Sequence, residues 1–220
     1  MEQQNKLKES TIRFFHDLFD LLLVNCLWML CCLPVITIGP ATCGMYAVTL
    51  KLAREEPVNP LKDFLRGLWD NFKAGILLEL LVALLVAFTA GDLWFAQLQS
   101  GWIQPLYITL ALVTGMACLI LISYAFPLQA MFRAPLKIQI LNALKLTAVA
   151  PVRSILLWVV LSVPVIAALT LPLEVLKVIG VMYLIVGFSG PAYGASRILR
   201  DIFDRVNGTS DEDVPHTAEK

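Results

Sequence analysis

Four long stretches of this chain contain no aspartate, glutamate, lysine or arginine. They cover residues 21–50, 93–132, 154–173 and 178–196. A membrane-spanning helix needs about 20 apolar residues, so each stretch is long enough to cross a bilayer. Hydrophobic residues make up 58% of the 220 residues and charged residues only 15%, a balance that a soluble domain of this size does not show. The chain is therefore predicted to be an all-α, polytopic membrane helix bundle with the lipid bilayer around it.

The first uncharged stretch is too long for one crossing. Its 30 residues would form a helix of about 45 Å, whereas the hydrocarbon core is about 30 Å thick. Pro34, Gly39 and Pro40 interrupt its centre, which predicts a helical hairpin. We therefore expect an integral membrane domain over residues 1–205 and a disordered cytoplasmic tail over residues 206–220. The domain is expected to contain six spans, at residues 14–33, 41–53, 74–97, 105–131, 153–171 and 176–196.

The lysine and arginine residues indicate how the chain is threaded. With six spans, 16 of the 17 basic residues lie on the side of both termini, and only Lys177 lies opposite. If residues 21–50 cross only once, five spans leave 13 of the 17 on one side. Basic residues are retained on the cytoplasmic side of a membrane. Six spans with both termini cytoplasmic are therefore expected, and five spans remain the alternative.

The segment between the second and third spans has the pattern of an amphipathic helix. Asn59 is a favourable N-cap and Pro60 suits the first helical position. Six apolar residues repeat at helical spacing, and the opposite face is charged. Such a helix can be a linker that lies on the membrane surface. Alternatively its polar face, including Lys62, Arg66 and Asp70, docks a cytoplasmic partner. The apolar residues are Leu61, Phe64, Leu65, Leu68, Trp69 and Phe72.

Short sequence matches suggest an internal repeat. Tyr46-Ala47 leads to Pro60-Leu61-Lys62, and Tyr124-Ala125 leads in the same way to Pro135-Leu136-Lys137, which predicts a second cytoplasmic amphipathic helix. Gly39-Pro40-Ala41 is matched by Gly190-Pro191-Ala192.

Glycine and proline residues in the last two spans are expected to be structural. Gly190 and Gly194 have the small-xxx-small spacing that lets membrane helices approach closely. Pro164 is expected to kink the fifth span.

Three polar residues lie within predicted spans. Polar and ionisable groups inside a membrane point to a functional role by default. For Asn25 the alternative is a hydrogen bond between helices, and for Glu79 it is a charge near the cytoplasmic interface; Asp92 approaches the outer surface.

Residue chemistry gives no support for catalysis. The sequence contains no phosphate-binding loop, nucleophile elbow or zinc-protease motif. The five cysteines lack Cys-x-x-Cys spacing and lie in apolar segments, where thiols act as small hydrophobic groups; they are Cys26, Cys31, Cys32, Cys43 and Cys118. We expect no enzyme activity, no metal, no cofactor and no nucleic-acid partner.

The run Leu33-Pro34-Val35-Ile36-Thr37-Ile38-Gly39-Pro40-Ala41-Thr42 resembles the opening of the YesL-like bacterial membrane proteins, a domain of unknown function. The resemblance continues through Asn71-Phe72-Lys73 and Asn142-Ala143-Leu144 and extends from about Phe14 to Arg205. It implies a multi-pass protein of the bacterial cell membrane with a role linked to carbohydrate uptake, and it supplies no catalytic residues.

Two functions are compatible with these features. The protein is expected to be a non-enzymatic accessory of a carbohydrate uptake system, with transporter subunits as its partners. The alternative is a small solute permease that acts alone or as a homo-oligomer, with a polar route past Asn25, Glu79 and Asp92.

Overall fold

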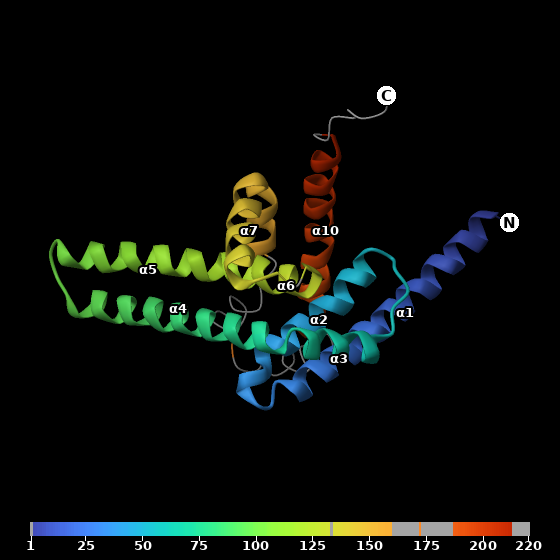
Figure 1. Ribbon diagram of the computed structural model, residues 1–220, viewed down its shortest axis with the longest axis horizontal. Helices are drawn as coiled ribbons and strands as arrows, with labels where there is room; N and C mark the ends of the chain where they lie inside the picture. The colour runs from blue at the N-terminus through green and yellow to red at the C-terminus, as the bar shows by residue number, and fades with distance from the viewer. Residues whose placement is uncertain (1, 133, 160–171, 173–186, 213–220) are drawn as a thin grey trace, which may run out of the picture.

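The computed structural model describes residues 2–132, 134–159, 172 and 187–212, and every regular element among them is helical. The predicted all-α class is confirmed. Figure 1 shows the arrangement of the helices. Their bounds are α1 Glu2–Cys31, η1 Val35–Thr37, α2 Ile38–Ala53, α3 Pro60–Asp70, α4 Phe72–Leu98, α5 Ile103–Ile120, η2 Leu121–Ala125, α6 Phe126–Phe132, α7 Leu136–Val149, a helix Pro151–Val159, and α10 Ser189–Glu212.

Three of the described helical segments are long and apolar enough to cross a membrane. They are Val35–Ala53, Phe72–Leu98 and Ile103–Phe132, and they correspond to the second, third and fourth predicted spans. A fourth exists if α7 and the helix Pro151–Val159, which meet at 104°, count as one broken span. The structure thus supports a membrane protein with three or four candidate spans. Most of the predicted spans 153–171 and 176–196, with Pro164, lies outside the described residues.

The predicted hairpin at Pro34–Pro40 is present, but its turn lies beside the start of α4. A Cβ atom added at Gly39 would lie 2.2 Å from the carbonyl oxygen of Gly75, so only glycine permits this approach. Gly75 is in the first turn of α4, about 35 Å of helix before Leu98. The turn is therefore far from the loop that joins α4 to α5, whereas six full crossings would put both on the outer side of the membrane.

Helix α2 is the centre of the fold and packs against α1, α3, α4, α6 and α10. Gly44 and Gly67 let α2 and α3 approach closely. Ser196 Oγ donates to Thr49 Oγ1 at 2.9 Å, and an Arg200 guanidinium nitrogen donates to the Ala53 carbonyl at 2.7 Å. Both bonds join residues 147 positions apart, so α2 and α10 run side by side in the same direction.

Helices α4 and α5 form a long antiparallel arm that projects from the rest of the molecule (Figure 1). Thr89 Oγ1 donates to Thr114 Oγ1 at 2.9 Å, and the rings of Phe95 and Tyr107 stack 5.8 Å apart. Most other side chains of the arm are apolar and exposed, including Leu84, Trp94 and Leu112. Exposure of so large an apolar surface to water is unfavourable, whereas the hydrocarbon chains of lipids can cover it. We therefore expect this arm to lie in the lipid bilayer.

The sequence repeat coincides with helix starts. Gly39-Pro40-Ala41 lies in the first turn of α2, and Gly190-Pro191-Ala192 lies in the first turn of α10. The two segments after the tyrosines form α3 and α7. Gly190 and Gly194 are half-buried, whereas the buried residues of α10 include the small residues Ala192, Ala195 and Ser196 as well as Leu199. Helix α10 continues to Glu212, past the predicted start of the tail at residue 206.

Candidate functional site

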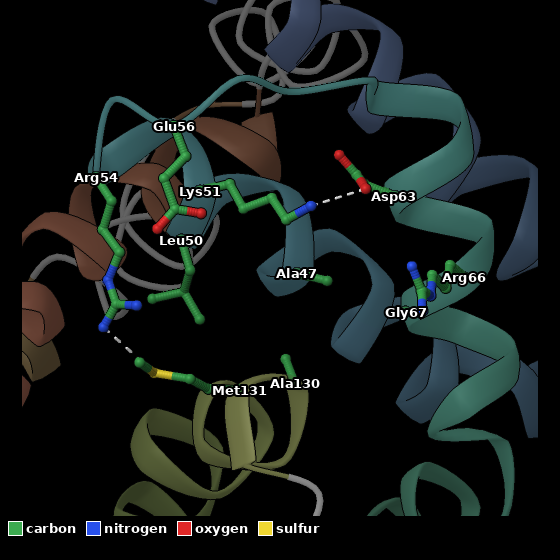
Figure 2. Close-up of a pocket in the computed structure, with 10 residues that line it drawn as sticks. All are labelled: Ala47, Leu50, Lys51, Arg54, Glu56, Asp63, Arg66, Gly67, Ala130 and Met131. Carbon is green, nitrogen blue, oxygen red and sulfur yellow. Dashed lines mark hydrogen bonds and ion pairs between the residues drawn. The ribbon is translucent and has the colours of Figure 1, made fainter.

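A charged cavity lies where the end of α2 meets α3 and α6 (Figure 2). Its volume is about 300 Å³. Three cations and two carboxylates line it together with apolar groups. The lining residues are Ala47, Leu50, Lys51, Arg54, Glu56, Asp63, Arg66, Gly67, Ala130 and Met131.

The start of α3 fixes one wall of this cavity. The Asn59 side chain accepts a hydrogen bond from the Lys62 amide at 3.1 Å, and Pro60 occupies the first turn, as the sequence predicts. Asp63 then accepts from Lys51 Nζ at 2.8 Å and from the Asn59 amide at 3.0 Å. Burial alone would raise the pKa of Asp63, but these two hydrogen bonds and the positive charges of Lys51 and Lys62 lower it below its usual value. The charge of Lys51 is thus balanced by Asp63 within the cavity.

The two arginines of the cavity are less well neutralised. An Arg54 guanidinium nitrogen donates to the Met131 sulfur at 3.7 Å, a weak acceptor, and Arg54 Nε is buried without a hydrogen-bond partner among the described residues (Figure 2). Arg66 forms an ion pair with Asp70 at 3.6 Å, but the Arg66 side chain is 70% exposed, so the pair is weak. The cavity therefore offers guanidinium groups to an anion.

One of the three predicted docking residues lines the charged cavity. Arg66 lines the charged cavity, whereas Lys62 and Asp70 are exposed on α3 outside it. Lys51 and Arg54 also line the cavity, although their place in the sequence indicated only basic residues on the cytoplasmic side of the membrane.

Asn25 and Glu79 both bind the amino-terminal end of another helix. Glu79 Oε2 accepts from the Gly39 amide at 2.9 Å, at the start of α2. Asn25 Oδ1 accepts from the Phe188 and Ser189 amides at 3.1 and 3.2 Å, at the start of α10. The first amides of a helix lack partners within the helix, so these side chains act as caps supplied by a neighbouring helix. The bonds to Asn25 join α1 to the start of α10.

Asp92 is separate from both of these residues. It is 9% exposed, and its Oδ2 has no hydrogen-bond partner among the described residues. It lies 13 residues after Glu79 on α4, which is about 20 Å along the helix. The structure therefore does not bring the three predicted intramembrane residues into one site.

Three buried side-chain amides form a hydrogen-bonded chain that the sequence alone did not predict. Gln139 Nε2 donates to Gln129 Oε1 at 2.6 Å, and Gln129 Nε2 donates to Asn71 Oδ1 at 3.1 Å. These bonds connect the start of α4 with α6 and α7. An uncharged polar residue inside an apolar run, as Gln129 is, was the only local signal for this connection.

The cysteines are free thiols in the part of the chain that the structure describes. Cys43 and Cys118 are buried, and Cys26 is exposed. No group of three or more histidine, cysteine or acidic side chains that could hold a metal occurs within the described ranges.

Comparison with known protein families gives one match. Residues 21–93, which include α2, α3 and most of α4, match the family described as "Protein of unknown function, DUF624". No curated protein matches the chain, and no solved structure matches it. The matched residues include Lys51, Arg54 and Arg66 of the charged cavity.

Proposed function

We propose that this membrane protein is a non-enzymatic partner of a carbohydrate uptake system and binds an acidic segment of a cytoplasmic partner in the charged cavity. The observation that carries the proposal is the pair of arginines, Arg54 and Arg66, that faces the cavity without full neutralisation. Guanidinium groups bind carboxylates through paired hydrogen bonds, which suits an acidic peptide. The link to carbohydrate uptake rests on the resemblance to the YesL-like proteins.

The exposure of α3 supports a position at the membrane surface. Phe64 and Leu68 are buried against the protein, whereas Leu61, Leu65 and Trp69 are exposed along a second side. The charged residues occupy the remaining side. A helix with these three sides fits the boundary between protein, lipid headgroups and water, as an amphipathic surface helix does. In that position the charged cavity opens to the cytoplasm.

We propose that both termini are cytoplasmic, in a bacterial cell membrane. The distribution of lysine and arginine favours this threading. If both helices of the hairpin at Pro34–Pro40 cross the membrane completely, the chain has six spans. A hairpin that enters the membrane and returns without crossing gives the same distribution, because both of its ends lie on one side. The contact of Gly39 with Gly75 favours this shallower hairpin.

The docking proposal is tested by two charge reversals on α3. Arg66→Glu should weaken copurification of transporter subunits from membranes of the source cell at least several-fold. Lys62→Glu is the matched control, because it changes the same charge one turn away and outside the cavity, and it should have little effect. If neither variant changes copurification, the docking proposal fails. Equal losses in both variants would assign binding to the exposed face of α3 and not to the cavity.

The permease alternative has one observation in its favour, the buried unpaired oxygen of Asp92 among the described residues. Its other two polar residues, Asn25 and Glu79, already cap helices. Flux of radiolabelled sugars into liposomes that contain only this protein tests the alternative. Flux that is lost in Asp92→Asn would establish the permease, and no flux above that of empty liposomes would reject it.

A further inference from the structure

A second cavity lies among α1, α2, α4, η2 and the start of α10, and it differs from the first in its chemistry. Its volume is about 540 Å³, within the usual range for small-molecule sites. The rings of Trp28, Tyr46, Phe126 and Phe188 line it, and Glu79 is the one charged residue in its described lining. Its walls are otherwise almost entirely apolar, so a ligand that fills it must be largely apolar.

The aromatic wall is held in place by its own contacts. The rings of Trp28 and Phe188 lie 4.3 Å apart, and Trp28 Nε1 donates to Thr42 Oγ1 at 3.2 Å. Thr42 in turn donates to the Ile38 carbonyl at 2.7 Å. Because the polar atom of Trp28 is satisfied within the protein, its ring presents only an apolar surface to the cavity.

The lining of the cavity also includes an irregular helical turn. Ile122 lies in η2, a π-helical turn, and Phe126 directly follows this turn. Single π-helical turns occur frequently at functional sites, because they change the direction of side chains within a continuous helix.

Two polar groups that line the cavity have hydrogen-bonding atoms without a partner among the described residues. Tyr46 is 3% exposed, and its hydroxyl forms no hydrogen bond with any described residue. Glu79 uses Oε2 to bind the Gly39 amide, and its other carboxylate oxygen forms no hydrogen bond within the described ranges. The free carboxylate oxygen of Glu79 can therefore accept a hydrogen bond from a ligand.

The charge of the cavity favours a neutral ligand. Both α2 and α10 begin at its wall, and each helix start carries about half a positive charge. Together these roughly balance the single negative charge of Glu79, so a cation gains little. A hydroxyl group can donate to the carboxylate oxygen that Glu79 does not use for the Gly39 amide, and it brings no second charge into the cavity.

We propose that this cavity binds a lipophilic alcohol, with its hydroxyl group at the Glu79 carboxylate and its hydrocarbon part against the aromatic wall. At about 30 Å³ per water-sized group, the cavity holds up to about 18 non-hydrogen atoms. A ten-carbon alcohol therefore fits. This site is independent of the docking proposal, because the two cavities share no lining residue.

The test uses quenching of tryptophan fluorescence by brominated ligands. The full chain, with Trp28 as its sole tryptophan and the others replaced by phenylalanine, is placed in phosphatidylcholine nanodiscs. 10-Bromodecan-1-ol should quench Trp28 saturably, with half-saturation at a concentration at least fivefold lower than that of 1-bromodecane. A variant with Trp94 as its sole tryptophan, which is 68% exposed on α4, reports partition into lipid and should show no saturation.

Variants of the cavity complete the test. Glu79→Gln should raise the half-saturation concentration several-fold, and the amide oxygen that it introduces still accepts from the Gly39 amide. Ala83→Phe adds bulk at the cavity wall and should abolish saturation while the protein keeps its thermal stability. Quenching of Trp28 that matches that of Trp94 would overturn the site. Saturable quenching with equal half-saturation for the alcohol and the alkane would overturn the assignment to an alcohol.

Discussion

The close approach of α2 and α4 gives the sharpest stability prediction. A Cβ atom at Gly75 would lie 2.6 Å from the Pro40 nitrogen, 2.8 Å from its Cα and 3.0 Å from the Gly39 carbonyl carbon. All three are backbone atoms that cannot rotate away, so Gly75→Ala must push the two helices apart. Overpacking of this kind costs about 1–3 kcal/mol. The shift also lengthens the 2.9 Å bond from the Gly39 amide to Glu79, and a lost cap costs about 0.5–2 kcal/mol.

The same helix provides a matched control. A Cβ atom at Gly91 would meet nothing within 4 Å, so Gly91→Ala has only the helix preference for alanine, a gain of up to about 1 kcal/mol. After an alanine gain of about 1 kcal/mol is subtracted from the overpacking and lost-cap costs, Gly75→Ala should destabilise the protein by about 0.5–4 kcal/mol. At about 2–4 °C per kcal/mol, the apparent Tm in detergent, followed by fluorescence-detected gel filtration, should fall by several degrees. Equal Tm values for the two variants would refute the contact between α2 and α4.

Contacts and charges of the described residues support four further predictions. Asn25→Ala should destabilise the protein by about 1–2 kcal/mol in thermal unfolding because it removes the acceptor for two helix-start amides, and Asn25→Asp should retain most of the stability. Asp63 has a lowered pKa in the folded protein, so its pair with Lys51 stabilises the fold above about pH 4–5, and this contribution is lost as the pH falls through the folded pKa; Asp63→Asn should flatten the decline of Tm in that acidic range. Replacing all five cysteines with alanine or serine should give a folded protein with modest loss of Tm, whereas bound metal that is lost in this variant would contradict their structural role. Reporter fusions at both termini should show a cytoplasmic location, and an external amino terminus would exclude the proposed threading.

Local patterns predicted the elements of this fold well where the signal lies within a short segment. The cap at Asn59 and the proline after it marked the start of α3. The predicted spans 74–97 and 105–131 correspond closely to α4 and to the segment Ile103–Phe132, because charge and hydropathy are local properties.

What the sequence could not provide is the partner of each polar group. Glu79 binds an amide 40 residues earlier, and Asn25 binds amides 163 and 164 residues later. No local pattern encodes contacts over such separations. The charged cavity was hidden for the same reason, since Arg54 and Arg66 belong to different segments that only the folded chain brings to one opening.

The position of α10 against α2 has a consequence for biosynthesis. Helix α2 leaves the ribosome early, but Ser196 and Arg200, which bind its Thr49 hydroxyl and Ala53 carbonyl, are made 147 residues later. At about 5–20 residues per second, this delay lasts about 7–30 s. Throughout that interval α2 lies in the membrane without the hydrogen bonds that α10 makes to Thr49 and Ala53. Helix α2 is therefore inserted early but completes its packing only after α10 has been made. A nascent chain that stops before α10 exposes an incompletely packed core to the quality-control proteases of the cell.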